Sequence, residues 1–200
     1  MKSILLIGCG GHAKSVVEII ESTNDWCVAG FVGLASQIGQ QVLGYNILGT
    51  DRDLASLRSS FSFALLAVGQ IKSSDVRQKL AHTVSSHGFS FPVVVASTAV
   101  ISRHAVIGAG TVVGHHAMVN AGASVGEHCI INTGSLVEHD SQISGFCHIS
   151  TNVAINGNVS IGHSSFVGSC SMIREGLALP PHSLISAGSR VMGWPPKDKL

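Results

Sequence analysis

Charged residues are scarce in this 200-residue chain, at 12 % of the sequence, which is about half the share usual for soluble domains. The formal net charge is only +1, so there is no basic excess to hold a phosphate backbone, and we expect no nucleic-acid partner. Aromatic residues reach only 5 %, yet hydrophobic residues reach 45 %, a composition that excludes a disordered chain.

Long hydrophobic runs are also missing. The apolar residues come in short bursts such as residues 4–7 and 93–95, far below the roughly 20 residues that span a bilayer, so we expect no membrane partner. The N-terminus starts with a strand-like run and lacks the features of a signal peptide, which predicts a cytoplasmic location. Five cysteines without paired spacing fit reduced thiols in that compartment.

What the chain does have is a six-residue period. Every sixth residue from Val95 to Val191 is Val, Ile or Leu, the residue two before it is usually small, and the residue after it is often Gly or Asn. Six residues can form one side of a triangular coil, and three sides close a coil of eighteen whose copies stack as parallel strands. The sequence therefore predicts a parallel β-helix of about five coils over residues 93–200, with Gly and Asn at corners that need unusual backbone angles.

Residues 1–92 alternate between strand and helix patterns, which predicts a small, Rossmann-like α/β domain with a parallel sheet. We expect strands at Ser3–Gly8, Cys27–Val32 and Phe61–Val68, and helices at Lys14–Glu21, Asp51–Arg58 and Ser73–Ser86. The turn at residues 8–13 formally fits G-x-G-x-x-A, but no acidic residue follows the second strand to hold a ribose, which argues against a nicotinamide enzyme. The turn is either a phosphate or diphosphate site or a purely structural turn.

Several short motifs occur in a characteristic order along the chain. They are G-G-H-A-K at 10–14, S-L-V-E-H-D at 135–140, F-C-H-I-S at 146–150, N-G-N-V at 156–159 and G-x-P-x-K at 193–197. With the domain order, they resemble the bacterial sugar acetyltransferases that include sialic acid O-acetyltransferase and UDP-N-acetylbacillosamine N-acetyltransferase, over essentially the whole chain. The resemblance implies a left-handed β-helix, acetyl-CoA as co-substrate, and a sugar or nucleotide-sugar acceptor, with no metal.

The resemblance also implies roles for individual residues. His139 matches the general base that deprotonates the sugar's amine or hydroxyl, with Asp140 as the carboxylate that orients it and Glu138 as the alternative. His148 matches a residue that contacts the acetyl group or its carrier. The further candidates for binding acetyl-CoA are Asn132, Gly157, Arg190, Gly193, Pro195 and Lys197, and those for binding the sugar substrate are Gly10, Gly11, His12, Lys14 and Gly69.

Two departures from the family pattern stand out. Val32 and Gly33 occupy the place where the UDP-sugar enzymes are expected to have acidic residues that contact uracil, which leaves the identity of the nucleotide open. Pro196 stands where the family usually has Ala in its C-terminal motif, a change that stiffens the loop.

The spacing gives an independent prediction about the site. Gly157 follows His139 by one coil of eighteen residues, so the two stack on the same corner, and the glycine leaves space and an N–H group for a thioester. His148 lies half a coil from His139, on the opposite side of the prism. The two imidazoles therefore meet only between subunits, and we expect a homotrimer with intersubunit active sites.

Alternatives remain open from the sequence. The base can serve either N-acetylation of a nucleotide-linked amino sugar, which we favour, or O-acetylation of sialic acid or a related sugar. A serine acetyltransferase would need an all-helical N-terminal region, and a non-catalytic or metal-dependent β-helix protein would need a three-histidine site or no base. A thiol nucleophile is disfavoured because Cys129 and Cys147 fall on the inward small position of the repeat.

Overall fold

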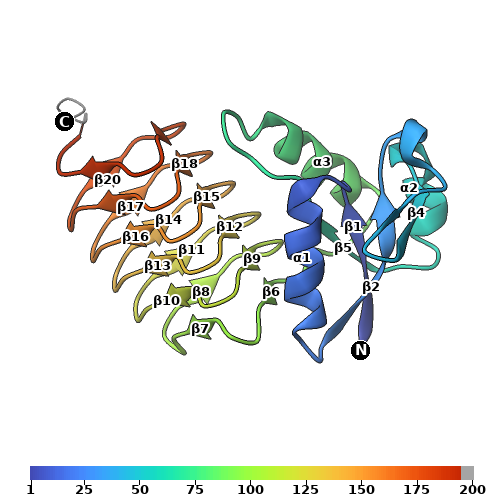
Figure 1. Ribbon diagram of the computed structural model, residues 1–200, viewed down its shortest axis with the longest axis horizontal. Helices are drawn as coiled ribbons and strands as arrows, with labels where there is room; N and C mark the ends of the chain where they lie inside the picture. Colours follow the sequence, from blue (N-terminus) through green and yellow to red (C-terminus); the bar gives the residue numbers. More distant parts are fainter. Residues whose placement is uncertain (195–200) are drawn as a thin grey trace.

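The computed structural model describes residues 1–194, and it confirms the predicted α/β part followed by a left-handed parallel β-helix (Figure 1). The N-terminal sheet has the order β3-β4-β2-β1-β5 and is parallel except for the antiparallel β3–β4 pair. Its strands are β1 (Lys2–Ile7), β2 (Trp26–Val32), β3 (Gln41–Val42), β4 (Tyr45–Gly49) and β5 (Phe63–Leu66). Its helices are α1 (Gly11–Glu21), α2 (Leu54–Leu57) and α3 (Asp75–Ser86), with short 3-10 turns η1 (Ala35–Gln37) and η2 (Asp51–Asp53).

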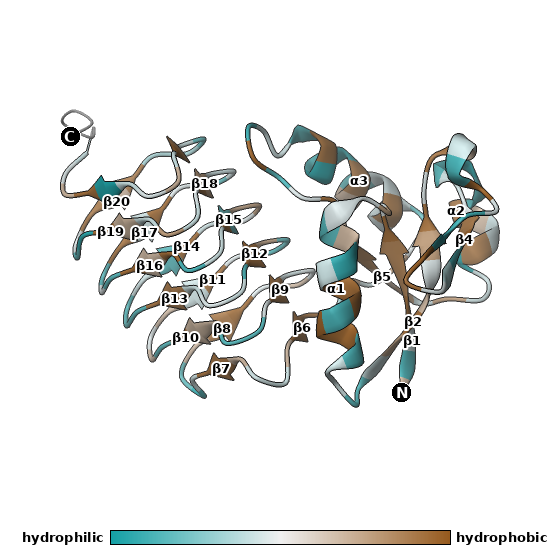
Figure 2. Cartoon of the chain, viewed as in Figure 1, coloured by the Kyte–Doolittle hydropathy of each residue, from teal (hydrophilic) through white to brown (hydrophobic). Residues whose placement is uncertain are grey.

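Helices cover both faces of this sheet because successive strand residues point to opposite sides. Ile4 and Leu6 of β1 pack with α1, which lies between the sheet and the β-helix (Figure 1). Leu5 and Ile7 pack on the other side, in a cluster with residues of α2 and α3. Figure 2 shows β1 and β5 as largely hydrophobic, as expected for strands buried on both faces.

Several N-terminal elements are shorter than predicted by one or two residues at an end, such as β5 and α3, and three differences are larger. The β3–β4 hairpin was not predicted, because its strands are short and partly polar and give no clear alternation. Helix α1 begins at Gly11, earlier than predicted, since Gly10 serves as its N-cap. The helix predicted at Asp51–Arg58 divides into η2 and a single turn of α2.

As far as residue 194, the β-helix contains seventeen two-residue strands in three parallel sheets of six, five and six strands. They are β6 (Val94–Val95), β7 (Val100–Ile101), β8 (Val106–Ile107), β9 (Val112–Val113), β10 (Met118–Val119), β11 (Ser124–Val125), β12 (Ile130–Ile131), β13 (Leu136–Val137), β14 (Gln142–Ile143), β15 (His148–Ile149), β16 (Ala154–Ile155), β17 (Ser160–Ile161), β18 (Phe166–Val167), β19 (Met172–Ile173), β20 (Ala178–Leu179), β21 (Leu184–Ile185) and β22 (Arg190–Val191). Each repeat aliphatic is the second residue of its strand, and these residues form one core together with small partners such as Cys129 and Ser141. The predicted phase is confirmed.

The prediction for the corners was wrong in one respect. The glycine that follows the aliphatic, such as Gly108 or Gly126, is not in the left-handed region. It is required because a Cβ at Gly108 would lie 2.5 Å from the backbone nitrogen of Glu127 in the next coil. The left-handed residues occur two positions later and recur every sixth residue, from Gly110 to Gly188, with His116 and Asp140 among them.

The N-terminal part covers one face of the β-helix, the sheet β21-β18-β15-β12-β9-β6. Val94 and Val112 of this sheet are buried in the same cluster as α1. Further along, the buried Arg77 of α3 donates hydrogen bonds to the carbonyl oxygens of Val68, at 2.5 Å, and His128, at 2.6 Å. These contacts fix the α/β part against the coils. Within residues 1–194 no helix is long and apolar enough to cross a membrane.

Candidate active site

His139 lies at an exposed corner of the β-helix, in the turn that follows β13. Its side chain is 55 % exposed, and its Nδ1 lies 2.9 Å from a carboxylate oxygen of Asp140. The carboxylate accepts the Nδ1 proton, so in the neutral ring Nε2 is unprotonated and can accept a proton. Asp140 is therefore placed to orient the imidazole.

Glu138 has a different function in the same turn. Its Oε2 accepts a hydrogen bond from Asn120 Nδ2 at 2.8 Å and another from the backbone N–H of His139 at 3.2 Å. This carboxylate ties adjacent coils together and holds the main chain of His139. Of the two acidic residues named from the sequence, Asp140 is the one whose carboxylate hydrogen-bonds to the ring.

Two glycines make room for this pair. A Cβ at Gly157 would lie 2.6 Å from both Cε1 and Nε2 of His139, which confirms the stacking predicted from the eighteen-residue spacing. Gly122 lies one coil before Asp140. A Cβ at Gly122 would collide with the Oδ1 atom of the Asp140 carboxylate. Gly122 and Asp140 both have positive φ, at 73° and 59°. Gly122 was not among the residues predicted from the sequence, although it precedes Asp140 by the same eighteen residues.

The acidic surroundings of His139 raise its pKa above the ordinary value. The main cause is the hydrogen bond to Asp140, and the charges of Asp140, Glu138 and Glu175 add to it. The raised pKa makes His139 a stronger base than a free imidazole.

A second cluster forms where the α/β part meets the β-helix, and it joins four of the predicted residues. The rings of His12 and His148 have centroids 6.4 Å apart, and Gly69 lies against His12, to which a Cβ at that position would come within 3.4 Å. Asn132 lies on the other side, with its Nδ2 atom 3.3 Å from His148 Nε2. Lys14, one turn further along α1 than Gly10, is exposed and lies outside this cluster.

His148 is buried rather than available on an outer face. We expected its side of the prism to face the next subunit, but the loop after β5 covers it, and the residue is 8 % exposed. Its Nδ1 donates to the carbonyl oxygen of Gln70 at 2.6 Å, so Nε2 accepts the proton of Asn132. Burial lowers the pKa of His148 to about 4, which keeps it neutral. A direct contact between His148 and the acetyl group would require one of these hydrogen bonds to break.

Arg77 completes this buried cluster, and sequence reasoning missed it. The pKa values of His12 and His128 are lowered to about 4. The larger cause is the burial of each histidine, and the positive charge of Arg77 adds to it. Four buried polar atoms lack a protein partner among the described residues, and all four belong to this interface. They are His12 Nε2, Gln70 Oε1, Arg77 Nε and His128 Nδ1. The signal in the sequence was an arginine on the apolar side of a predicted helix, which is uncommon without a partner.

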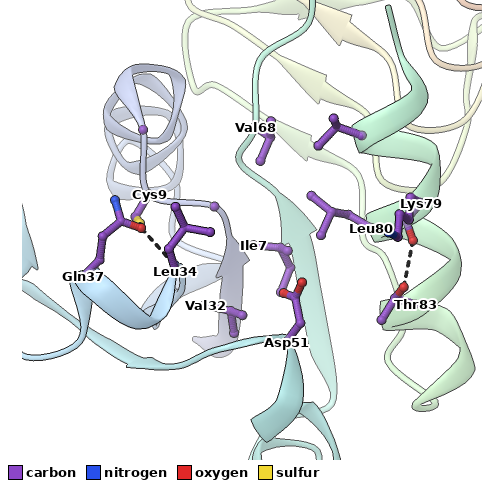
Figure 3. A pocket seen from close by; sticks show the side chains of 14 residues that line it. Ile7, Cys9, Val32, Leu34, Gln37, Asp51, Val68, Lys79, Leu80 and Thr83 are labelled. Atoms are coloured by element: carbon purple, nitrogen blue, oxygen red, sulfur yellow. Dashed lines mark hydrogen bonds between the residues drawn. The ribbon is translucent and has the colours of Figure 1, made fainter.

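A cavity of about 530 Å³ opens at the carboxyl ends of β1, β2 and β5 (Figure 3). It is lined by Ile7, Gly8, Cys9, Gly10, Val32, Gly33, Leu34, Gln37, Asp51, Val68, Val76, Lys79, Leu80 and Thr83. This edge of a parallel sheet is where α/β proteins commonly bind nucleotides. Val32 and Gly33, which stand where the resemblance led us to expect acidic residues, are part of the wall.

The three glycines of the first turn are not equally necessary for the fold. Gly8 has a φ of 99°, and a Cβ there would collide with Val68. The backbone conformation and the packing therefore require glycine at this position. Gly10 and Gly11 have ordinary φ, and a Cβ at either would meet nothing within 4 Å. The fold does not need glycine at these two positions. They leave the backbone at the N-terminus of α1 open, and that helix has no acidic residue in its first turn, which suits an anion such as a diphosphate.

Comparison with known proteins agrees with this arrangement. Residues 3–84 match the model of the PglD N-terminal domain. The perosamine N-acetyltransferase PerB from Caulobacter crescentus, solved in complex with CoA and GDP-perosamine, is 32 % identical, with a TM-score of 0.88 over 96 % of this chain and 89 % of that one. The chain belongs to this family of sugar acetyltransferases.

Two further relatives support the same assignment. The acetyltransferase domain of PglB from Neisseria gonorrhoeae, in complex with acetyl coenzyme A, is 29 % identical over 96 % of this chain and 91 % of that one, with a TM-score of 0.87. The GDP-perosamine N-acetyltransferase of Escherichia coli O157:H7 is 22 % identical over 92 % of this chain and 82 % of its own length. The protein is thus an acetyl-CoA-dependent sugar acetyltransferase.

The remaining predicted residues of this sugar acetyltransferase lie elsewhere. Arg190 is exposed on β22 and Gly193 follows that strand, while Pro195 and Lys197 lie outside the described residues. Cys129 is fully buried in the β-helix core, and burial raises the pKa of its thiol, which does not suit a nucleophile. Among residues 1–194, no three His, Cys, Asp or Glu side chains gather in a way that could hold a metal ion.

Proposed function

We propose that this sugar acetyltransferase moves the acetyl group of acetyl-CoA directly to the amino group of a nucleotide-linked amino sugar, with His139 as general base. The observation that carries the proposal is the exposed His139–Asp140 pair, whose Nε2 side lies against Gly157. N-acetylation is favoured over O-acetylation because the similar solved enzymes bound to a sugar nucleotide are perosamine N-acetyltransferases.

The geometry supports a direct transfer. The amine nitrogen of the sugar attacks the thioester carbonyl while Nε2 of His139 takes the amine proton, and Asp140 stabilises the imidazolium that forms. The oxyanion of the tetrahedral intermediate can receive the backbone N–H of Gly157, which makes no hydrogen bond within the described residues. Collapse of the intermediate breaks the carbon–sulfur bond, and the CoA thiolate takes the proton back from His139. The products are the acetamido sugar and CoA.

The cavity of the α/β part is the proposed site of the nucleotide. Its aliphatic walls suit a base, and the open backbone at Gly10 and Gly11 suits the diphosphate. His12 and Gly69 lie beside this turn and would face the sugar. The C-terminal residues Arg190 and Gly193 remain candidates for CoA, since β22, which begins at Arg190 and precedes Gly193, belongs to the same sheet as β13, which precedes His139.

We further propose that the active site forms between subunits of a homotrimer. His139 follows the sheet β22-β19-β16-β13-β10-β7, whereas His12 and His148 lie at the sheet on which the α/β part docks, so one chain keeps them apart. The sheet that leads to His139 presents Val100 and Met118 to solvent, at 57 % and 37 % exposure. Such apolar residues on a flat sheet suit a subunit interface.

The test is a thiol-release assay with acetyl-CoA and a panel of acceptors: GDP-linked and UDP-linked 4-amino sugars, and free sialic acids. We expect turnover with a nucleotide amino sugar and a loss of about 10²–10⁴ in kcat for His139→Ala. His82→Ala, an exposed histidine on α3, serves as the matched control and keeps the wild-type rate. Full activity of His139→Ala on the best acceptor, or turnover of sialic acid alone, would overturn the proposal.

A further inference from the structure

One carboxylate lines the cavity, that of Asp51, and it forms no hydrogen bond within its own turn. Asp51 and Asp53 both belong to η2, but Asp53 caps that turn by accepting hydrogen bonds from the N–H of Thr50, at 2.8 Å, and from its hydroxyl, at 2.9 Å. Asp51 makes no hydrogen bond or ion pair within the part of the chain that the structure describes. Its side chain lines the cavity and points into it in Figure 3.

The position of Asp51 follows from the order of the strands. β4 lies beside β2 in parallel, with Gly49 opposite Val32 at their carboxyl ends. Two residues after Gly49 the chain reaches Asp51, so the end of β4 brings an acidic group to the edge at which β2 provides none. No carboxylate follows β2 directly, but Asp51, in the turn after the neighbouring strand β4, lies at the same edge of the sheet.

The rest of the cavity allows a planar base but does not choose between bases. Ile7, Val32 and Leu80 offer aliphatic surface for the faces of a ring. Gln37 has its Oε1 occupied by the N–H of Leu34, at 2.9 Å, and the thiol of Cys9, at 3.0 Å, so its amide presents only N–H donors to the cavity. A donor of this kind suits the carbonyl oxygens of guanine and uracil equally.

A carboxylate does discriminate between bases. Guanine carries two adjacent donors, N1–H and the 2-amino group, which one carboxylate can accept side by side. Uracil offers a single N–H between two carbonyl oxygens, so the second carboxylate oxygen would face an acceptor. Adenine and cytosine place an acceptor nitrogen next to their amino group. Only guanine satisfies both oxygens of a carboxylate.

We propose that Asp51 selects guanine as the base of the nucleotide-sugar substrate. This rests on the proposed function, in which the cavity holds the nucleotide. Asp51 accepts N1–H and the 2-amino group of guanine, the aliphatic walls enclose the ring, and Gln37 donates to an acceptor atom of the same base. The substrate class is therefore a guanosine diphosphate-linked amino sugar.

The experiment is titration calorimetry of the full chain with GDP, IDP and UDP, where IDP differs from GDP only by the missing 2-amino group. In the wild type we expect GDP to bind about 10-fold more tightly than IDP, and UDP to bind most weakly. In Asp51→Asn we expect GDP affinity to fall by about 10-fold or more and to come within about 2-fold of IDP, because an amide cannot accept from both donors. Asp25→Asn, an exposed residue before β2 at the other end of the strand, keeps the wild-type order.

The outcomes separate this inference from the function on which it rests. Equal affinity for GDP and IDP in the wild type, tighter binding of UDP, or an equal loss for all three nucleotides in Asp51→Asn would overturn the selection of guanine by Asp51. In each of these cases the nucleotide-sugar assignment itself would stand. If none of the three nucleotides bound, the nucleotide-linked substrate of the proposed function would fall, and this inference with it.

Discussion

Gly157 lies directly against the imidazole of His139 in the preceding coil, so close that a single methyl group would come within 2.6 Å of Nε2. That nitrogen is the one left free by the hydrogen bond between Nδ1 and Asp140. The β-helix thus places a residue without a side chain at the atom that takes the substrate's proton in the proposed mechanism.

Gly157→Ala should therefore lower kcat without unfolding the protein. The methyl group would displace the ring or block the approach of the thioester, and we expect a loss of at least about 10-fold, since small displacements of reacting groups are costly. Gly145→Ala is the matched control, because its Cβ would have 3.4 Å to the nearest atom and its φ is ordinary. Steady-state kinetics and urea unfolding of both variants check this. Unchanged kcat in Gly157→Ala would show that the space beside His139 is not used.

Asp140→Asn should change the pH dependence as well as the rate. His139 acts as a base only when neutral, so kcat/KM of the wild type falls as the pH drops below its raised pKa. Without the carboxylate that pKa decreases, so the acidic limb should move to lower pH while the plateau falls by about 10-fold or more. A pH–rate profile measures both effects. A lower plateau with an unmoved limb would mean that Asp140 does not set the pKa of the base.

Acid should destabilise the fold through its buried histidines. The pKa of His12 and of His148 is about 4 in the folded protein, below the ordinary 6.5, so the unfolded chain binds protons first as the pH falls. Their contribution is complete above about pH 6.5 and is lost between about pH 6.5 and 4, by at most about 3 kcal/mol for each histidine. Urea midpoints at about pH 7 and pH 4.5 measure this loss.

The variant pair for this test is His148→Gln and His82→Gln. The first removes a buried titrating group, so its stability should depend less on pH than that of the wild type. The second removes an exposed histidine and should leave the pH dependence as it is. Identical pH dependence in all three proteins would contradict the assignment.

Mixed trimers should restore activity from two inactive chains. We expect His139→Ala and His12→Asn each to be inactive or nearly so, because in the proposed trimer the two residues act in the same site. If that site joins different subunits, co-expression in equal amounts leaves about a quarter of the sites with both native residues. Thiol release at about a quarter of the wild-type rate per site is expected from the mixture. No recovery in trimers of confirmed mixed composition would place the whole site within one chain.

Arg77→Met should weaken the docking of the α/β part on the β-helix. It leaves the carbonyl oxygens of Val68 and His128 without their buried donor, and we expect a loss of about 2–5 kcal/mol. Arg77→Lys keeps one donor and should lose less. Thermal or urea unfolding gives the difference, and a loss below about 0.5 kcal/mol in Arg77→Met would show that these hydrogen bonds contribute little.

The sequence by itself determined the β-helix, its phase and the stacking of Gly157 on His139. It could do so because the repeat fixes the register by counting: residues eighteen apart are neighbours wherever the period is unbroken. The family motifs added the expected chemistry at His139. The corner angles were misplaced, since a small residue after the aliphatic indicates glycine without telling whether a positive φ or close packing requires it.

Only the tertiary structure decided what happens where the two parts meet. The burial of His148 beneath the loop at Gln70, the hydrogen bonds of Arg77 and the position of Asp51 in the cavity all join segments that no period relates. Such contacts depend on how two separately folded surfaces pack, which local propensity does not encode. The low pKa values of the buried histidines arise from the same packing, because desolvation requires the complete interface.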